Sequence, residues 1–142
     1  MTKIAQYIRP LALGILMKDG KILAVREFDR KKNEIFYRLL GGGIEFGETG
    51  EEALKREFME ELGVEINVKK RLGVLENLFT FENQQGHEIC LLYSVELSDK
   101  NVSEKEKLPM IEPQHAGKFA EYIDVNTPHI YPDGWQELIK QA

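Results

Sequence analysis

The chain has 142 residues, of which 42% are hydrophobic and 30% charged, and its net charge at pH 7 is -5. This length suits one domain with its own core, so we expect residues 1–142 to form a single domain. A negative net charge argues against a general nucleic-acid binder, which carries a basic surface. No apolar run approaches the roughly 20 residues that span a membrane, and the first residues lack the apolar core of a signal peptide. With a single cysteine, Cys90, the composition predicts a cytoplasmic protein without nucleic-acid or membrane partners.

Three strands are predicted before the first helix. Residues 8–17 are almost all apolar, which is typical of a strand covered on both faces. Asp19 and Gly20 then predict a two-residue hairpin turn into a strand over residues 21–28. A charged loop at residues 29–33 leads to a third strand over residues 34–40.

A helix is predicted after the three glycines at 41–43, which break regular structure and allow close backbone approach. Thr49 is the expected N-cap, and Glu52 stands three residues later, as in a capping box. Gly63 is placed to end the helix. The buried stripe of this helix is predicted to consist of Ala53, Leu54, Phe58 and Leu62.

The second half of the chain predicts further strands and one more helix. Residues 64–76 are expected to be extended, and residues 78–81 and 87–97 to form a hairpin closed over residues 84–86. Residues 98–114 are polar with two prolines and predict a long surface loop. A strand at 119–124 and a helix at 134–141 follow. This order predicts an α+β fold, a mixed sheet with helices packed on it.

Two acids of the predicted helix lie beside its buried stripe. At about 100° per residue, Glu61 borders the stripe and Glu57 lies one turn before it on the same side. Carboxylates four residues apart repel each other, and the edge of a core raises the cost of their charge. Lys55 and Arg56 are expected to point elsewhere, so a cation such as Mg²⁺ should come from outside the helix. The alternative is a solvated acidic face with an Arg56–Glu60 ion pair.

The run from Gly41 to Val64 resembles the Nudix box, whose signature is G-x5-E-x7-R-E-U-x-E-E-x-G-U, with U a bulky apolar residue. A chance match in such a chain has a probability on the order of 10⁻⁷. One departure precedes the box, where many members have a Trp and then Leu-Pro-Gly-Gly: Leu40 replaces the proline here, and Tyr37 stands where we expect the Trp. Every specified place of the signature is filled, by Gly42, Glu48, Arg56, Glu57, Phe58, Glu60, Glu61, Gly63 and Val64.

The resemblance implies the Nudix fold, a mixed β-sheet sandwiched between α-helices (α/β/α), over residues 1–142. It implies a metal-dependent hydrolase that cuts a phosphoanhydride bond in a small nucleoside diphosphate derivative. The implied cofactor is Mg²⁺ or Mn²⁺, and a homodimer is common in the family. A Nudix domain that senses a nucleotide without cutting it is the first alternative, although the intact acids argue against it. An isomerase acting on a prenyl diphosphate is the second, and no motif supports it.

The resemblance also assigns roles to residues of the box. Glu57, Glu60 and Glu61 are the implied metal ligands, and a backbone carbonyl at Gly41 or Gly42 is a further candidate. Arg56 and Glu48 are implied to orient the acids through a salt bridge and hydrogen bonds.

Residues outside the box complete the predicted site. The family usually recruits a further acid, for which Glu88 is the leading candidate because it alternates with Cys90 and Leu92 along a strand. A strand-edge salt bridge is the alternative role for Glu88, and His87 is expected to be a surface or hydrogen-bonded histidine rather than a base. The other candidate acids are Glu76, Glu104, Glu106 and Glu112. The predicted substrate-binding residues are Arg9, Arg26, Arg38 and Tyr37, and the other aromatic candidates for stacking on a base are Tyr7, Phe36, Phe79 and Phe81.

Overall fold

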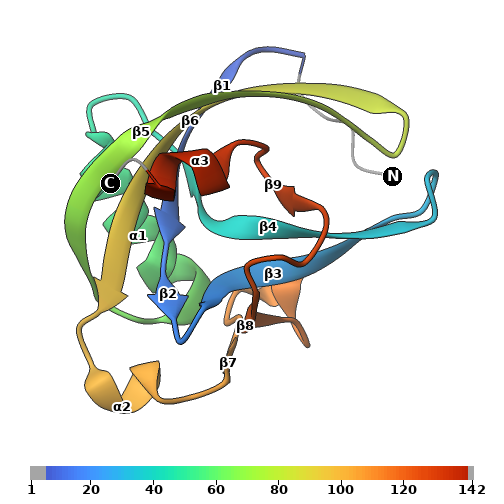
Figure 1. The fold of residues 1–142 in the computed structure, drawn as a ribbon. Coiled ribbons are helices and arrows are strands. Elements are labelled where there is room, and N and C mark those ends of the chain that lie inside the picture. Colours follow the sequence, from blue (N-terminus) through green and yellow to red (C-terminus); the bar gives the residue numbers. More distant parts are fainter. Residues whose placement is uncertain (1–5, 141–142) are drawn as a thin grey trace.

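The computed structural model describes residues 6–140. The elements in chain order are β1 (Arg9–Ile15), β2 (Met17–Lys18), β3 (Lys21–Asp29), β4 (Glu34–Gly43), α1 (Gly50–Leu62), β5 (Ile66–Phe81), β6 (Gln84–Leu97), α2 (Lys100–Ser103), β7 (Lys107–Pro109), the 3-10 turn η1 (Pro113–His115), β8 (Phe119–Asp124), β9 (Ile130–Tyr131) and α3 (Trp135–Lys140). The strands form one mixed sheet in the order β5-β6-β1-β4-β3-β8-β7, to which β2 and β9 are added through β3 and β4 (Figure 1).

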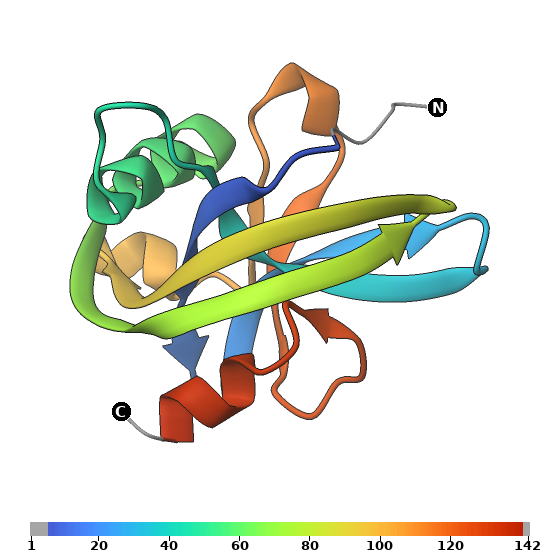
Figure 2. The same ribbon diagram turned by 90° about the horizontal axis from the view of Figure 1, so that it is seen from above.

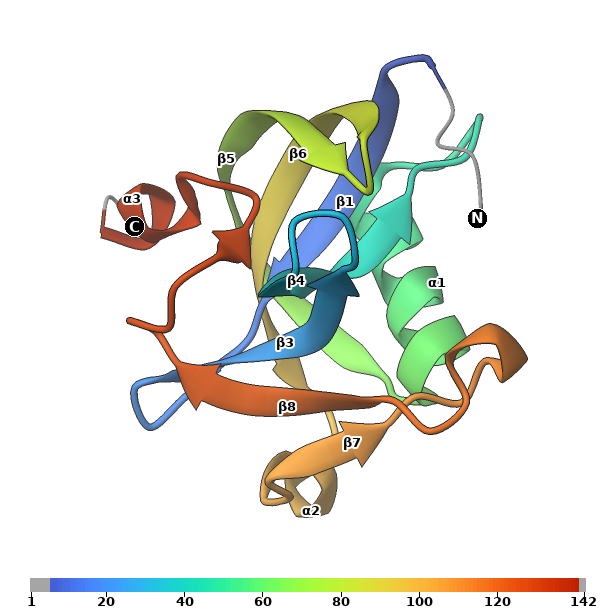
Figure 3. The ribbon, with the colours of Figure 1, turned by 90° about the vertical axis from the view of Figure 1, so that its right-hand side faces the viewer.

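The sheet lies between helices, which confirms the predicted α+β, α/β/α architecture. In Figure 3, α1 covers one face of the sheet and α3 covers the other. Strand β1 is buried on both faces, as its apolar run predicted: Ala12 belongs to the core under α1, whereas Leu11 and Leu13 belong to the core under α3. Phe58 of α1 and Trp135 of α3 are both completely buried in these two cores. Within the described residues 6–140, no helix is long and apolar enough to cross a membrane.

The first hairpin turn was predicted correctly, whereas the position of the second was wrong. Asp19 and Gly20 have φ values of 51° and 74°, as a turn between paired strands β2 and β3 requires. The β5–β6 hairpin closes at Glu82 and Asn83, with φ values of 48° and 65°, and not at residues 84–86, which belong to β6. Tertiary contacts explain the position, because the Glu82 backbone N–H donates to the Asp29 carboxylate on another hairpin.

Strand β5 is one element of 16 residues, although two separate extended segments were predicted. Its register against β6 shifts between Val68 and Lys70 and again between Arg71 and Gly73. These irregularities let the strand bend without ending, which the sequence pattern did not reveal.

The segment predicted as a long surface loop at 98–114 is mostly exposed, but it contains α2 and β7 and reaches into η1, so the expectation of a loop alone was wrong. The strand in this segment depends on pairing with a later part of the chain, since Leu108 of β7 pairs with Ala120 of β8. The predicted helix at 134–141 is α3, which begins at Trp135, and Gln141 lies outside the described residues. The short strand β9 was not predicted.

The tips of two hairpins are joined by buried acids. Asp29 at the end of β3 accepts hydrogen bonds from the backbone N–H groups of Lys31, Lys32 and Glu82 at 2.9, 3.0 and 3.0 Å. Glu82 in turn accepts from Nε and Nη2 of Arg30 at 2.8 and 2.9 Å. Both acids are buried, with 2% and 5% of their surface exposed. The β3–β4 and β5–β6 hairpins, which run side by side in Figure 2, are therefore tied together at their ends.

Candidate active site

One cleft of about 1110 Å³ collects most of the predicted site residues. It extends from the glycines of β4 and the acidic side of α1 to the ends of the two tied hairpins. Carboxylates outnumber basic residues in its lining: the acids are Glu27, Asp29, Glu34, Glu57, Glu60, Glu61, Glu88, Glu112 and Asp133, and the bases are Arg9, Lys32 and Arg38. An anionic ligand would be repelled from such a cleft unless cations accompanied it.

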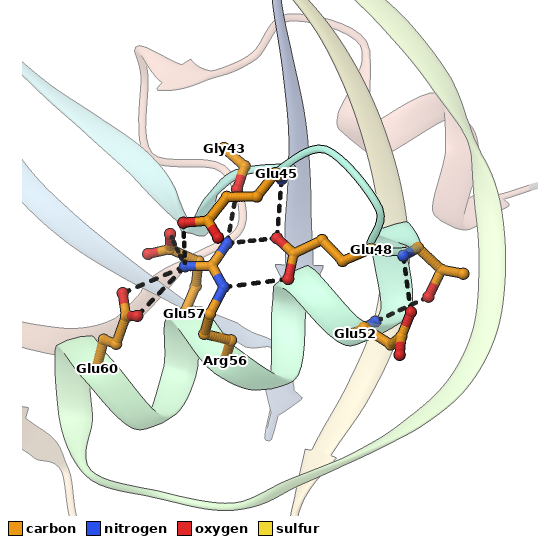
Figure 4. Close-up of polar contacts among 8 residues, drawn as sticks. Gly43, Glu45, Glu48, Glu52, Arg56, Glu57 and Glu60 are labelled. Carbon is orange, nitrogen blue, oxygen red and sulfur yellow. Dashed lines mark hydrogen bonds and ion pairs between the residues drawn. The ribbon is translucent and has the colours of Figure 1, made fainter.

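Helix α1 is fixed at both ends by local contacts that the sequence predicted. The side chain of Thr49 accepts from the Glu52 backbone N–H at 3.1 Å, and the Glu52 carboxylate accepts from the Thr49 backbone N–H at 2.9 Å. This reciprocal capping box is visible at the helix start in Figure 4. Gly63 ends the helix with φ 67°, and its N–H donates to the Met59 carbonyl at 2.9 Å. The acids of the helix are therefore held in a defined register against the sheet.

Glu61 is a buried acid with an unsatisfied oxygen. Only 4% of its surface is exposed, and its Oε1 has no hydrogen-bond partner among the described residues. Its Oε2 accepts from Nη2 of Arg38 on β4 at 3.5 Å. Burial raises the pKa of Glu61 to about 7, while the positive charge of Arg38 and hydrogen bonding from the Gly41 backbone oppose the rise. Arg38 of β4 therefore supplies a positive charge from outside the helix to Glu61.

Glu57 packs against the backbone of β4 at Gly42. A Cβ atom on Gly42 would lie only 2.4 Å from the carboxyl carbon of Glu57, so only glycine leaves room for this side chain. Burial is the main cause that raises the pKa of Glu57, and hydrogen bonding from Arg56 opposes it. The glycine run predicted as a place of close approach therefore accommodates an acid of α1.

Arg56 lies at the centre of the acids, which corrects the expectation that it points away from them (Figure 4). Its Nε and Nη2 bond the two oxygens of Glu48 at 3.2 and 2.5 Å, and Nη2 also donates to the Gly43 carbonyl at 2.9 Å. Its Nη1 donates to Glu57 at 3.0 Å and to both oxygens of Glu60 at 3.3 Å. The long side chain places the guanidinium among Glu48, Glu57 and Glu60, so the angular position of its Cα did not predict where the guanidinium lies. Hydrogen bonding from Arg56 also lowers the pKa of Glu48.

Two half-buried residues outside the box approach Glu61. Glu112 directly precedes the 3-10 turn η1 and His115 is its last residue, and ligand atoms of Glu61, Glu112 and His115 lie within 4.8 Å of one another. In the described part of the chain this is the only such group of three potential ligands, so Glu57 and Glu60 do not join Glu61 at that spacing. Glu112 was a secondary candidate from the sequence, whereas His115 was missed.

Glu88 lines the same cleft but is engaged by other residues. It accepts from the side-chain amide of Asn77 at 3.1 Å and lies 3.8 Å from Nη1 of Arg9. Burial raises the pKa of Glu88, while the contacts with Asn77 and Arg9 oppose the rise. The contact with Arg9 matches the salt bridge expected as its alternative role, and Glu88 also lines the cleft.

The predicted substrate-binding residues divide into two groups. Arg9 and Arg38 line the cleft, whereas Arg26 and Tyr37 are not among its lining residues. Arg26 and Tyr37 are register partners on β3 and β4, where Arg26 is exposed and Tyr37 packs against the core under α3. The candidate acids Glu76, Glu104 and Glu106 do not line the cleft either.

Aromatic side chains gather at the hairpin end of the cleft. The ring centroid of Phe36 lies 5.8 Å from that of Phe81, edge-on, and 5.8 Å from that of Tyr131. All three line the cleft. Phe36 and Arg38 stand on the same strand two residues apart, so the aromatic group lies roughly 7 Å along the strand from Arg38. Tyr131 was missed because it belongs to the unpredicted strand β9.

The chain is similar to known proteins in sequence and in fold. The model of the NUDIX domain family matches residues 8–130. An ADP-ribose pyrophosphatase from Methanocaldococcus jannaschii is 35% identical over 102 residues, which are 68% of this chain and 57% of that protein. The low-salt glycan biosynthesis protein Agl8 from Haloferax volcanii is 30% identical over 112 residues, which are 74% of this chain and 70% of that protein. The crystal structure of a MutT NUDIX hydrolase from Burkholderia pseudomallei has a TM-score of 0.66 and 19% identity, covering 96% of this chain and 99% of that chain.

Proposed function

The chain belongs to the NUDIX domain family, and from that premise we propose that it hydrolyses a phosphoanhydride bond in a nucleoside diphosphate derivative with the help of Mg²⁺ or Mn²⁺. The observation that carries the proposal is Glu61, a buried acid with an unsatisfied oxygen that faces a cleft rich in carboxylates. A buried charge without a full set of partners is costly, and a bound cation would remove that cost.

The chain's own residues fit such an ion. Glu57 and Glu61 stand one turn apart on α1, and Gly42 leaves the space that Glu57 needs. The chemistry that a divalent cation supplies at these acids is neutralisation of the diphosphate charge and activation of a water. Arg56 orients Glu57 and Glu60, while Glu48 holds Arg56 in place through two hydrogen bonds. Arg56 and Glu48 are positioning residues in this scheme.

We assign Glu112 as the acid outside the box that completes the set. It lies beside Glu61, and its charge adds to the effect of burial, which is the main cause that raises the pKa of both Glu57 and Glu61. Glu88 takes a different role, because it is already bonded to Asn77 and faces Arg9. That pair directs the guanidinium of Arg9 along the cleft, where it can bind a substrate phosphate.

The substrate class follows from the two ends of the cleft. The acids of α1 suit the diphosphate through bound cations, and the aromatic group of Phe36, Phe81 and Tyr131 suits a nucleobase. The Methanocaldococcus relative carries the name ADP-ribose pyrophosphatase, which makes ADP-ribose the first compound to test. A nucleotide-sensing domain without catalysis would have no need for the complete set of acids.

The test is a hydrolysis screen in Mg²⁺ with ADP-ribose, nucleotide sugars, dinucleoside polyphosphates and nucleoside triphosphates, with products identified by mass. Glu61→Gln should lower kcat by orders of magnitude in a protein that still folds. Glu51→Gln is the matched control, because Glu51 lies on the same helix but pairs with Lys55 outside the cleft. Near-normal turnover by folded Glu61→Gln, or no turnover of any compound by the wild type, would contradict the proposal.

A further inference from the structure

We propose that Glu61, Glu112 and His115 bind a divalent ion through two carboxylates and one imidazole nitrogen, so that this position prefers a first-row transition ion such as Mn²⁺, Co²⁺ or Zn²⁺ to Mg²⁺. The inference rests on the proposed function in one respect, the use of Glu61 as a metal ligand. It adds a nitrogen ligand from outside the box and a rank order of ions.

The spacing of the three side chains suits a shared ion. Each offers one ligand atom, and these atoms lie within 4.8 Å of one another. Two atoms that bind the same ion at roughly 2.1 Å lie at most roughly 4 Å apart. Small rotations of the side chains are therefore enough to bring the three ligands onto one ion.

Two buried atoms in this group have no hydrogen-bond partner among the described residues: Oε1 of Glu61 and Nδ1 of His115. The Glu61 side chain is 5% exposed, so water cannot easily satisfy its oxygen. Buried polar atoms are nearly always paired, and two unpaired atoms on neighbouring side chains therefore need an explanation. A cation accounts for both at once, since a carboxylate oxygen and a neutral imidazole nitrogen each donate a lone pair.

The turn that carries Glu112 and His115 is anchored to α1 and to the sheet. The Ile111 backbone N–H donates to the carbonyl of Glu61 itself at 2.8 Å. The His115 N–H donates to the Glu112 carbonyl at 2.9 Å, which closes the turn between the two ligands. Met110 is buried in the core under α1, and its N–H donates to the Lys118 carbonyl at 3.0 Å. The two ligands are thus held opposite Glu61 before any ion binds.

Neighbouring charges are compatible with an ion at this position. The positive charges of Arg38 and Lys118 act on His115, and both side chains are bonded to Glu27. Two positive charges are therefore partly neutralised by an acid that does not belong to the group of three. The net charge left near Glu61 and Glu112 is negative, which favours a divalent cation.

The imidazole determines which ions are preferred. Mg²⁺ favours oxygen ligands, whereas imidazole suits Zn²⁺ and the neighbouring transition ions. A site of carboxylates alone would discriminate weakly between Mg²⁺ and Mn²⁺. With His115 as a ligand, the affinity for a transition ion should depend on this side chain and the affinity for Mg²⁺ should not.

The experiment uses the full chain with Mn²⁺ or Mg²⁺ as the only added ligand. Pulsed EPR of the Mn²⁺ complex should show coupling to a directly bound nitrogen in the wild type, and His115→Gln should abolish it. Titration calorimetry should show the Kd for Mn²⁺ rising roughly 10- to 100-fold in that variant, while the Kd for Mg²⁺ changes less than about threefold. His87→Gln and His129→Gln are matched controls that should keep the nitrogen signal, and these are the other two of the three histidines of the chain.

A nitrogen signal that persists in His115→Gln would overturn the inference. So would Mn²⁺ binding to the wild type without nitrogen coupling, which would leave the proposed function standing on carboxylates alone. If His115→Gln does not fold, ¹⁵N-histidine NMR of the wild type with Zn²⁺ decides the matter. One histidine should show the shift of a metal-bound ring nitrogen. That signal is assigned to His115 if it remains in both His87→Gln and His129→Gln. Three unshifted histidines would overturn the inference.

Discussion

Nη2 of Arg38 lies 3.5 Å from Oε2 of Glu61, so a strand residue supplies the positive charge that faces the most buried acid of α1. The same guanidinium donates through Nε to Glu27 at 3.2 Å. Arg38 therefore bonds only one oxygen of Glu61, and Oε1 has no hydrogen-bond partner within residues 6–140. Arg38 thus compensates only part of a charge that a divalent cation would compensate fully.

Glu61→Gln should be more stable than the wild type in chelator, whereas Mg²⁺ should stabilise the wild type more than the variant. In chelator at pH 8, the variant should be more stable than the wild type by about 2 kcal/mol, because it removes a buried charge whose pKa is raised to about 7. With Mg²⁺ at about 100 times its Kd, the wild type should gain about 2.7 kcal/mol and the variant much less. Urea unfolding in chelator and in Mg²⁺ measures both effects. A variant that Mg²⁺ stabilises as strongly as the wild type would exclude Glu61 as a principal ligand.

Gly42→Ala tests the contact between β4 and Glu57. The added Cβ would lie 2.4 Å from the Glu57 carboxyl carbon and must displace that side chain. A displacement of about 1 Å can cost about 100-fold in rate, so kcat/KM should fall by about that factor while the free energy of unfolding drops by about 1 kcal/mol. Gly43→Ala is the matched control, since its Cβ would meet nothing closer than Arg9 Nη2 at 3.7 Å. Equal losses in the two variants would contradict the role given to Gly42.

Arg56→Lys tests whether geometry or charge holds the acids in place. Lysine keeps the positive charge but cannot form the paired bonds to Glu48 and the bond to the Gly43 carbonyl. The free energy of unfolding should fall by about 2 kcal/mol and activity by about 10- to 100-fold. Lys55→Arg, one position earlier and paired with Glu51, is the control for a change of cation on this helix. Full activity in Arg56→Lys would mean that charge alone is enough.

Helix α1 was predictable because its signals are local. The capping box of Thr49 and Glu52, the glycine at 63 and the apolar spacing all lie within one segment, and each of them appears in the structure. The buried position of Glu61 followed from the same periodicity. The partner of Glu61 was not predictable, because Arg38 meets it only through the packing of β4 on α1 and looked like any of three strand arginines.

The approach of Glu112 and His115 also depends on contacts between distant parts of the chain. The Ile111 N–H bonds the carbonyl of Glu61, fifty residues earlier in the sequence, and β7 pairs with β8 to hold the segment. The sequence from 98 to 114 is polar without a clear period, so it resembled a loop. Similarly, the turn at Glu82 depends on Asp29, and glutamate is not a residue that favours a positive φ.

The tied hairpin tips predict a loss of stability in acid. Burial raises the pKa of Asp29, but hydrogen bonds from the backbone N–H groups of Glu82, Lys32 and Lys31 outweigh it, and the net pKa is lowered. Hydrogen bonds from Arg30 lower the pKa of Glu82. A lowered pKa in the folded state contributes stability above the ordinary values of 3.8 and 4.5, and this contribution is lost as the pH falls through the folded values.

Asp29→Asn should therefore be less stable than the wild type at pH 7, and the difference should shrink as the pH falls below about 4. Urea midpoints in chelator at several pH values between 7 and 2.5 measure this, with Glu51→Gln as a surface control. Because the tips carry Phe81 next to Phe36, the variant should also raise KM for a nucleoside substrate more than it lowers kcat. A stability difference that stays constant down to pH 2.5 would show that the Asp29 charge does not hold the hairpins together.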